Sequence, residues 1–111
     1  MKLDFNIRPT QHRPQLDFQA INRAALAVLP SLLVRWLPNG CVESKREYVA
    51  CNPVRADRRP GSFKINMRTG AWADFATGDK GRDVVSLAAY LSGKKQSEAA
   101  RALAEMLGVN I

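Results

Sequence analysis

Two short segments with strand-like alternation, at residues 62–67 (SFKINM) and 71–75 (AWADF), most constrain what this chain can fold into. In the first, apolar and polar side chains alternate, which predicts a strand with one buried face. Only Arg-Thr-Gly at 68–70 separates the two segments, so they are expected to form an antiparallel hairpin. Residues 42–50 are polar until close to their end, and therefore suit one strand at a solvent-facing edge.

The sequence before these strands predicts two helices. Residues 17–29 repeat apolar side chains at the 3.6-residue spacing of a helix, and Asp17 can cap the first turn. Pro30 cannot donate a hydrogen bond to that helix, but proline is well accepted in a first turn. Residues 31–38 are therefore expected to form a second short helix or a kinked continuation.

Two further helices are predicted after the strands. Asp83 can cap a helix over residues 84–91, which Gly93 ends, and Ser97 can cap a last helix over residues 98–107. The order of helices, small antiparallel sheet and helices predicts an α+β fold.

Length and composition restrict the class of protein. The 111 residues suit one domain, expected over residues 17–111 after an extended N-terminal arm over residues 1–16. No apolar run reaches the roughly 18 residues of a membrane span, and the first residues lack the apolar core of a signal peptide. Cys41 and Cys51 provide no disulfide framework. A cytoplasmic location without membrane contact is the default expectation.

The net charge of +7 is unevenly distributed along the chain. Residues 1–40 hold five Lys/Arg against two acids, residues 41–82 hold nine against five, and residues 83–111 hold three against three. Such a basic excess favours a polyanionic partner, with nucleic acid first and an acidic protein surface second. A solvated basic face without a partner is the simpler alternative.

Basic and aromatic side chains interleave between residues 55 and 82, which predicts a surface for single-stranded nucleic acid. Such a surface stacks bases on an exposed ring and holds phosphates with nearby cations, without reading sequence. Trp72 supplies the ring in this prediction, with burial in the core as its alternative, whereas Phe63 and Phe75 are expected in the core. The predicted binding residues are Arg58, Arg59, Lys64, Arg68, Trp72, Lys80 and Arg82.

Catalytic and metal-binding side chains are sparse. The single histidine, His12, lies in the arm and is expected to be solvated, and Cys51 has no nearby histidine and is expected to be a buried thiol. Three acids, Asp74, Asp79 and Asp83, cluster around one loop and would suit Mg²⁺, although turn formation and helix capping explain them more simply. No catalytic residue, metal or other cofactor is predicted.

The turn at residues 78–83 (GDKGRD) opens a predicted helix and has the glycines of phosphate-binding loops. Free N–H groups at a helix start favour an anion, and Lys80 and Arg82 add positive charge. Lys80 precedes the second glycine and no Ser or Thr follows it, so the spacing is not that of a nucleotide-hydrolysing P-loop. A contact to a backbone phosphate remains the expectation.

From residue 17 to residue 109 the chain resembles the zinc-binding domain of bacterial and phage DNA primases that stands in front of a Toprim-type catalytic domain. That family has a Tyr-bearing strand, Cys-Pro-x-His, a basic turn with Pro-Ser-Phe, a hairpin, Cys-x-x-Cys in an aromatic-bearing turn, Gly-Gly-Asp, and a Glu-Ala-x-x-x-Leu-Ala helix. The segments that match in this order are Tyr48, 52-NPVR-55, 57-DRRPGSF-63, 72-WADFATG-78, 81-GRDVVSL-87 and 98-EAARALAEMLGV-109.

The match breaks at the metal ligands. Asn52 and Arg55 stand at the first Cys and the His, and Asp74 and Thr77 stand at the second pair. A structural zinc needs four Cys or His ligands. The resemblance therefore implies a zinc-ribbon-like sheet without zinc. We expect Arg55 and Asp74 to form a charge-assisted pair in the metal's place, with Asn52 and Thr77 satisfying nearby backbone groups.

The function implied by the resemblance is that of a non-catalytic module of a DNA primase or primase-helicase from a mobile element. The expected partners are single-stranded template DNA, contacted during replication priming, and a primase catalytic (Toprim), helicase or polymerase domain in cis or in trans. Neither a polymerase carboxylate cluster nor a helicase P-loop is present, so catalysis by this chain alone is not expected. Two alternatives are an adaptor that docks a polymerase or helicase through the first helices and the last one, and an enzyme fragment with a cation-dependent site at Asp74, Asp79 and Asp83.

Overall fold

The computed structural model describes residues 16–44 and 46–109, which form helices at both ends and an antiparallel sheet between them. The sheet order β1-β2-β3-β4-β5 follows the sequence. The elements are α1 (Phe18–Ala27), α2 (Leu29–Trp36), β1 (Cys41–Ser44), β2 (Glu47–Ala50), β3 (Phe63–Asn66), β4 (Trp72–Asp74), β5 (Lys80–Gly81), α3 (Val84–Ser92) and α4 (Gln96–Leu107). This confirms the predicted small α+β fold. The predicted arm lies, except for Leu16, outside the described residues.

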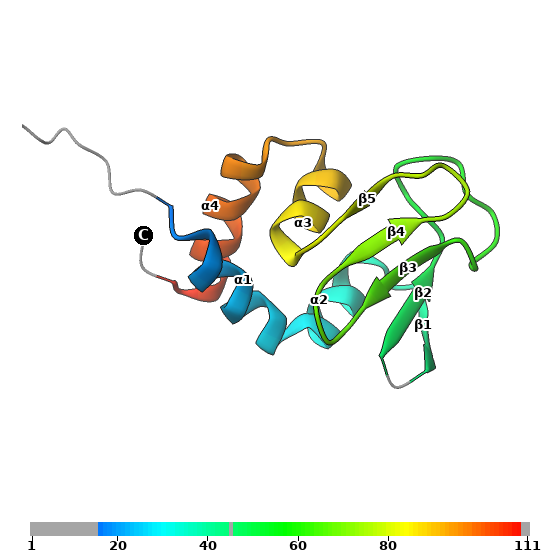
Figure 1. Cartoon of the computed structure of the whole chain (residues 1–111), viewed down its shortest axis with the longest axis horizontal. Helices are drawn as coiled ribbons and strands as arrows, with labels where there is room; N and C mark the ends of the chain where they lie inside the picture. Colours follow the sequence, from blue (N-terminus) through cyan, green and yellow to red (C-terminus); the bar gives the residue numbers. More distant parts are fainter. Residues whose placement is uncertain (1–15, 45, 110–111) are drawn as a thin grey trace, which may run out of the picture.

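Helices α1, α3 and α4 gather at one end of the body and the strands lie at the other (Figure 1). Helices α1, α3 and α4 contact one another, and α2 follows α1 towards the sheet. The core lies between these helices and one face of the sheet, and its largest fully buried side chains include Phe63, Ile21, Leu29, Leu33 and Leu87. Every helix of the described residues is too short or too polar to cross a lipid bilayer.

The first two helices form as predicted, for local reasons. Asp17 caps α1, because its carboxylate accepts a hydrogen bond from the Ala20 amide at 3.0 Å. Pro30 lies in the first turn of α2, where its missing N–H costs no helical hydrogen bond. The apolar stripe of α1 continues into α2 and buries Ile21 and Leu29, whereas Phe18 remains 39% exposed.

The predicted single strand over residues 42–50 is wrong, because this segment forms two strands. Strands β1 and β2 pair antiparallel, with Val42 opposite Tyr48 and Ser44 opposite Glu47. All of β1 is exposed, so its side chains carry no buried–exposed alternation from which a separate strand could be predicted. Strand β5, only two residues long, was likewise absent from the prediction, which placed a loop there.

The strand register divides the sheet into an inner and an outer face. Tyr48, Ile65 and Trp72 are aligned across β2, β3 and β4, and all three are buried. The adjacent row contains Lys64 and Ala73 and points to the other face, because successive residues of a strand alternate between faces. Met67, predicted to point inward with Phe63 and Ile65, lies beyond the end of β3 and is only half-buried.

The C-terminal helices confirm one predicted cap and correct another. Asp83 caps α3 by accepting from the Ser86 amide at 2.8 Å, and Gly93 ends this helix in the left-handed conformation. The Ser97 cap is wrong, because α4 begins at Gln96. The Glu98 carboxylate accepts a hydrogen bond from the Lys95 amide at 3.1 Å. The helix therefore begins earlier in the sequence than predicted, and Ser97 lies inside its first turn.

A close contact on the inner face of the sheet explains why a residue without a side chain is needed at position 81. The Trp72 indole N–H donates to Ser86 Oγ at 2.9 Å, and Gly81, opposite Trp72 in the sheet, lies directly against both groups. A methyl group at position 81 would overlap the indole nitrogen and the hydroxyl. We therefore interpret Gly81 as a packing residue.

Replacing Gly81 by alanine is expected to destabilise the fold by about 1–3 kcal/mol, because the indole and the Ser86 hydroxyl must move apart to admit the methyl group. Urea unfolding followed by tryptophan fluorescence measures this change. Lys80→Ala, at the exposed neighbouring position, is the control and should leave the midpoint nearly unchanged. Equal midpoints for Gly81→Ala and wild type would contradict the packing role.

Candidate functional site

A buried carboxylate, Asp74, joins the turn after β2 to the turn after β4, the two turns in which the sequence resemblance predicts degenerate metal positions. Asp74 has no exposed surface. The Arg55 guanidinium donates to it through Nε at 2.7 Å and through Nη2 at 3.4 Å, Asn52 Nδ2 donates at 2.9 Å, and the Ala76 amide donates at 2.9 Å. The predicted pair of Arg55 and Asp74 is therefore confirmed as a contact.

The same network extends to helix α3, which the sequence did not predict. Asn52 Nδ2 also donates to the Tyr90 hydroxyl at 2.8 Å, and that hydroxyl donates to Asp79 Oδ2 at 2.8 Å. Tyr90 lies in a run that reads as an apolar helix face. The tyrosine itself could have indicated a polar contact at this position, because a hydroxyl near the core needs a hydrogen-bond partner.

The remaining predicted roles at the metal positions are also observed. Asn52 Oδ1 accepts from the Val54 amide at 2.9 Å, and Thr77 Oγ1 accepts from the Asp79 amide at 3.2 Å. The side chains at these positions do not fit zinc, since Arg55 is a cation and Asn52 directs its amide N–H groups towards Asp74. Polar and ionic hydrogen bonds link the two turns instead.

The ionisation of the network follows from its hydrogen bonds. The Arg55 guanidinium holds the pKa of Asp74 well below its usual range, against burial, which alone would raise that pKa. The hydrogen bond to Asp74 in turn raises the pKa of Arg55. Burial raises the pKa of Tyr90, so its hydroxyl keeps the proton that it donates to Asp79. At neutral pH the pair is fully ionised.

The lowered pKa of Asp74 predicts loss of stability in acid. An aspartate in the unfolded chain has a pKa of about 3.9, so the folded state binds this proton less readily than the unfolded state. The contribution of Asp74 is therefore complete above about pH 5 and declines as the pH falls towards 2. Urea midpoints between pH 7 and pH 2 test this, because Asp74→Asn should show a weaker pH dependence than wild type. Parallel curves would contradict the assignment.

Truncating either member of the pair tests how strongly the two are coupled. Arg55→Met should destabilise the fold, because it leaves the buried Asp74 carboxylate without its cation. Asp74→Asn should also destabilise, and the double variant should cost less than the sum of the two single changes. Additive costs in urea unfolding would show that the contact contributes no coupling. Truncation is preferable to exchanging the residues, because Asn52 and Ala76 would then direct donor groups at a guanidinium.

The three acids of the predicted cation site are not brought together. Asp74 is paired with Arg55, Asp79 accepts from Tyr90, and Asp83 caps α3. Within residues 16–44 and 46–109, no group of three or more Cys, His, Asp or Glu side chains is placed to hold a metal ion. The carboxylate-site alternative is therefore wrong for this part of the chain.

Three amides at the start of α3 are already hydrogen-bonded within the protein and are not available to a phosphate. The amide of Ser86 is bonded to the Asp83 carboxylate, the amide of Val85 donates to Asn22 Oδ1 at 2.9 Å, and the amide of Leu87 donates to the Asp83 carbonyl. The Asp83 carboxylate would also repel an anion at this helix end. Gly81 serves contact with Trp72, so the expected phosphate site built on the backbone amides of this helix start is not supported.

Trp72 in β4 and Phe75 directly after it have the opposite exposure to the one predicted: Trp72 is buried and Phe75 is exposed. Trp72 is 6% exposed and belongs to the core, with its ring centroid 4.5 Å from that of Tyr90, so it is not available to stack a base. Phe75, predicted in the core, is 73% exposed. Because Asp74 must point inward to meet Arg55, strand alternation turns Ala73 and Phe75 outward. Phe63 is fully buried, as predicted.

The sheet register brings part of the predicted basic set to the outer face. Val49, Lys64, Ala73 and Lys80 form one row across β2 to β5. Lys64 Nζ lies 3.3 Å from a carboxylate oxygen of Glu43, an exposed ion pair that screening by salt weakens. This row therefore presents two cations separated by a small side chain.

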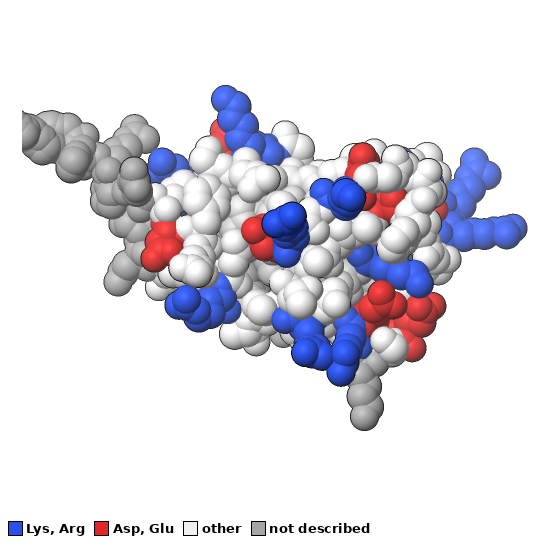
Figure 2. Space-filling view, in the orientation of Figure 1, with Lys and Arg blue, Asp and Glu red and all other residues white. Residues whose placement is uncertain are grey.

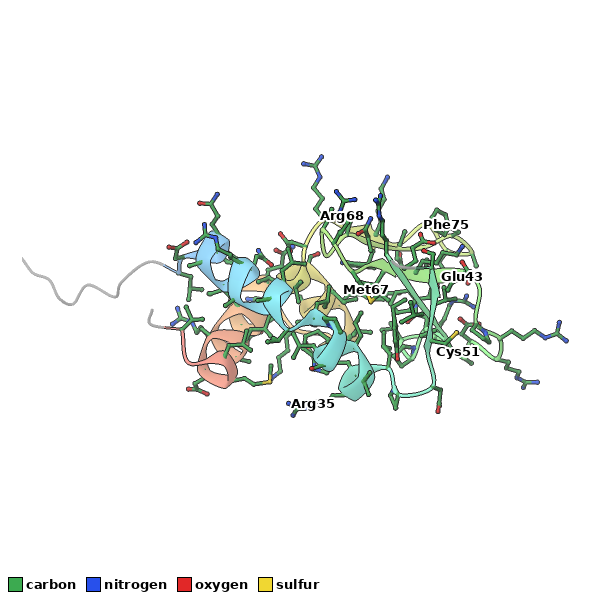
Figure 3. The ribbon with its side chains drawn as sticks, turned by 90° about the horizontal axis from the view of Figure 1, so that it is seen from below. Arg35, Glu43, Cys51, Met67, Arg68 and Phe75 are labelled. Carbon is green, nitrogen blue, oxygen red and sulfur yellow. The ribbon has the colours of Figure 1, made fainter. Side chains whose placement is uncertain are left out.

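The other predicted cations lie at the borders of this face or beyond it. Arg68, in the β3–β4 turn, and Arg82, after β5, are exposed. Figure 3 shows Arg68 and Phe75 along one side of the sheet, and Arg35 of α2 on the opposite side of the molecule. One exposed cation, Arg46, was not among the predicted binding residues. Its backbone carbonyl accepts a hydrogen bond from the Met67 amide at 2.6 Å, which places Arg46 close to Arg68 in the chain fold.

Arg58 and Arg59 belong to a different part of the surface. Both are exposed in the β2–β3 loop. Figure 2 shows two basic side chains extending from the end of the body at which Figure 1 places this loop. The same view shows acidic groups next to several basic ones, so the surface is mixed in charge. Cys51, at the start of the same loop, is half-buried, where a buried thiol was predicted.

We define the outer sheet face as Lys64, Arg68, Phe75, Lys80 and Arg82. It combines cations with one exposed aromatic ring, which is the composition that single-stranded nucleic acid requires. In comparisons with known proteins, no family model matches the chain and no curated protein matches it at a significant level. The resemblance to the primase zinc-binding domain thus rests on the order of the motifs and stays a prediction.

Proposed function

We propose that this chain is a non-catalytic module that binds single-stranded DNA within a DNA primase or primase-helicase system. The observation that carries the proposal is the outer sheet face, where Lys64 and Lys80 lie in one register row beside the exposed ring of Phe75. Phosphate contacts from such cations give binding that is independent of sequence and weakened by salt.

The network around Asp74 supports the primase part of the proposal. Arg55 and Asp74 stand at the positions of a His and a Cys ligand in that family, and they are in direct contact at 2.7 Å. Two turns that the family joins through zinc are therefore joined here through an ion pair. The partner domain, Toprim, helicase or polymerase, would supply the catalysis in cis or in trans.

An adaptor function is the second candidate, and one observation favours it. A groove of about 450 Å³ lies between α2, α3 and α4, and its lining is largely apolar, with Trp36, Leu91 and Met106 among its residues. Met106 of α4 is substantially exposed. Such a groove suits the apolar face of a partner protein segment.

Salt dependence of binding tests the proposed function. We expect a labelled single-stranded oligonucleotide to bind at low salt. The logarithm of its binding constant should fall linearly with the logarithm of the salt concentration, with a slope of about −0.7 for each phosphate contact. The variant Lys64→Ala/Lys80→Ala should bind more weakly, and the magnitude of its salt slope should decrease by the amount expected for about one to two phosphate contacts. Lys94→Ala/Lys95→Ala, which removes the same charge from the link between α3 and α4, is the matched control and should change little.

Two outcomes would reject the nucleic-acid function. One is the absence of binding at low salt, and the other is an affinity that does not respond to salt. An equal loss from both double variants would show a response to net charge alone and would reject the outer sheet face as the site.

A further inference from the structure

An aromatic side chain held outward on an ordered backbone lies at one end of the outer sheet face, directly after β4. The Phe75 amide donates to the Ser62 carbonyl at 2.8 Å, which extends the β3–β4 pairing by one residue beyond β4. The preceding residue, Asp74, is fixed by Arg55 and Asn52. The ring is therefore presented to solvent from a backbone position held by the pairing with the β3 side and by the fixed residue that precedes it.

Cations flank this ring on both neighbouring strands. Ala73 is directly opposite Lys64 on β3 and Lys80 on β5, and Phe75 lies two residues further along the same face. Lys64 is thus a diagonal neighbour of Phe75 across the extended β3–β4 pairing, and such neighbours lie about 7–8 Å apart, within reach of long side chains. Lys80 lies on β5, which follows the turn that begins at Phe75. A base lying on the ring would have its adjoining phosphates within reach of either ammonium group.

We propose that Phe75 stacks an unpaired base while Lys64 and Lys80 hold the phosphates on either side of it. Because this inference rests on the proposed function of the outer sheet face, it assigns the binding mode of that site. A base within a duplex already stacks on both sides, whereas an unpaired base has a free face for an aromatic ring. The site therefore selects single-stranded over double-stranded nucleic acid.

Removing the bases from the ligand separates stacking from charge. Wild type and Phe75→Ala are each titrated with a single-stranded oligonucleotide and with an abasic oligonucleotide of equal length and charge. Wild type should bind the base-containing strand about 5- to 150-fold more tightly, the effect of one stacked base. Phe75→Ala should abolish this ratio and keep the affinity for the abasic strand. Phe18→Ala, which removes an exposed ring from α1, is the matched control and should keep the ratio.

The outcomes distinguish this inference from the function on which it rests. If Phe75→Ala keeps the full preference for the base-containing strand, stacking on Phe75 is overturned, while salt-dependent binding by the lysines stands. If neither strand binds wild type at low salt, the proposed function itself is overturned. An unchanged urea midpoint for Phe75→Ala shows that the fold is intact, as expected for a ring that is 73% exposed.

A fluorescent variant gives an independent measurement. Phe75→Trp retains a stacking surface and places an indole at the site. Its emission should be quenched by the base-containing strand and not by the abasic strand, beyond any change seen for wild type. Equal quenching by the two strands would overturn stacking at this position.

Discussion

The buried carboxylate of Asp74 is the constraint on which the arrangement of the sheet depends. An ionised group without solvent contact is stable in a protein only if its lone pairs are satisfied by donors. Arg55, Asn52 and the Ala76 amide supply these donors, and they come from both turns of the predicted metal site. The position of one carboxylate thus fixes the β2–β3 loop against the end of β4.

This solution differs energetically from a metal site. A structural zinc contributes about 10–16 kcal/mol of binding free energy to folding, whereas an ion pair must first offset the cost of removing its charges from water. The stability of the domain must therefore come mainly from apolar burial, and the core that joins Ile21 and Leu33 of the first helices to Phe63 and Leu87 supplies it. The network specifies how the turns meet, while the helices and the inner sheet face provide most of the driving force.

The parts of the fold that were predictable are those governed by local chemistry. Asp17, Pro30 and Asp83 act on the helix starts next to them, and each behaves as the sequence indicates. The contact of Arg55 with Asp74 was predictable because the motif order of the primase zinc-binding domain, which the sequence resembles, aligns the two turns. The division of residues 42–50 into β1 and β2, and the strand β5, were missed because an all-exposed strand and a two-residue strand lack the periodicity that prediction requires.

The errors at Trp72 and Phe75 have a different cause. Hydropathy treats both residues as core candidates, and only the inward direction of Asp74 decides which of them is buried. A strand places its side chains on alternate faces, so a buried Asp74 requires a buried Trp72 and an exposed Phe75. The same tertiary dependence concealed the link from Asn52 to Tyr90, whose residues are 38 positions apart in the sequence.

The network also connects the stability of the domain to the geometry of its outer face. The Asp74 amide donates to the Asp79 carbonyl at 2.8 Å, and the Asp79 carboxylate accepts from Tyr90 of α3. Asp79 immediately precedes Lys80, and Asp74 immediately precedes Phe75. The hydrogen bonds that satisfy the buried carboxylate therefore also hold the backbone of the exposed ring and of one of its flanking cations. Residues that never contact a ligand would in this way determine the spacing between the ring and the charge that a ligand encounters.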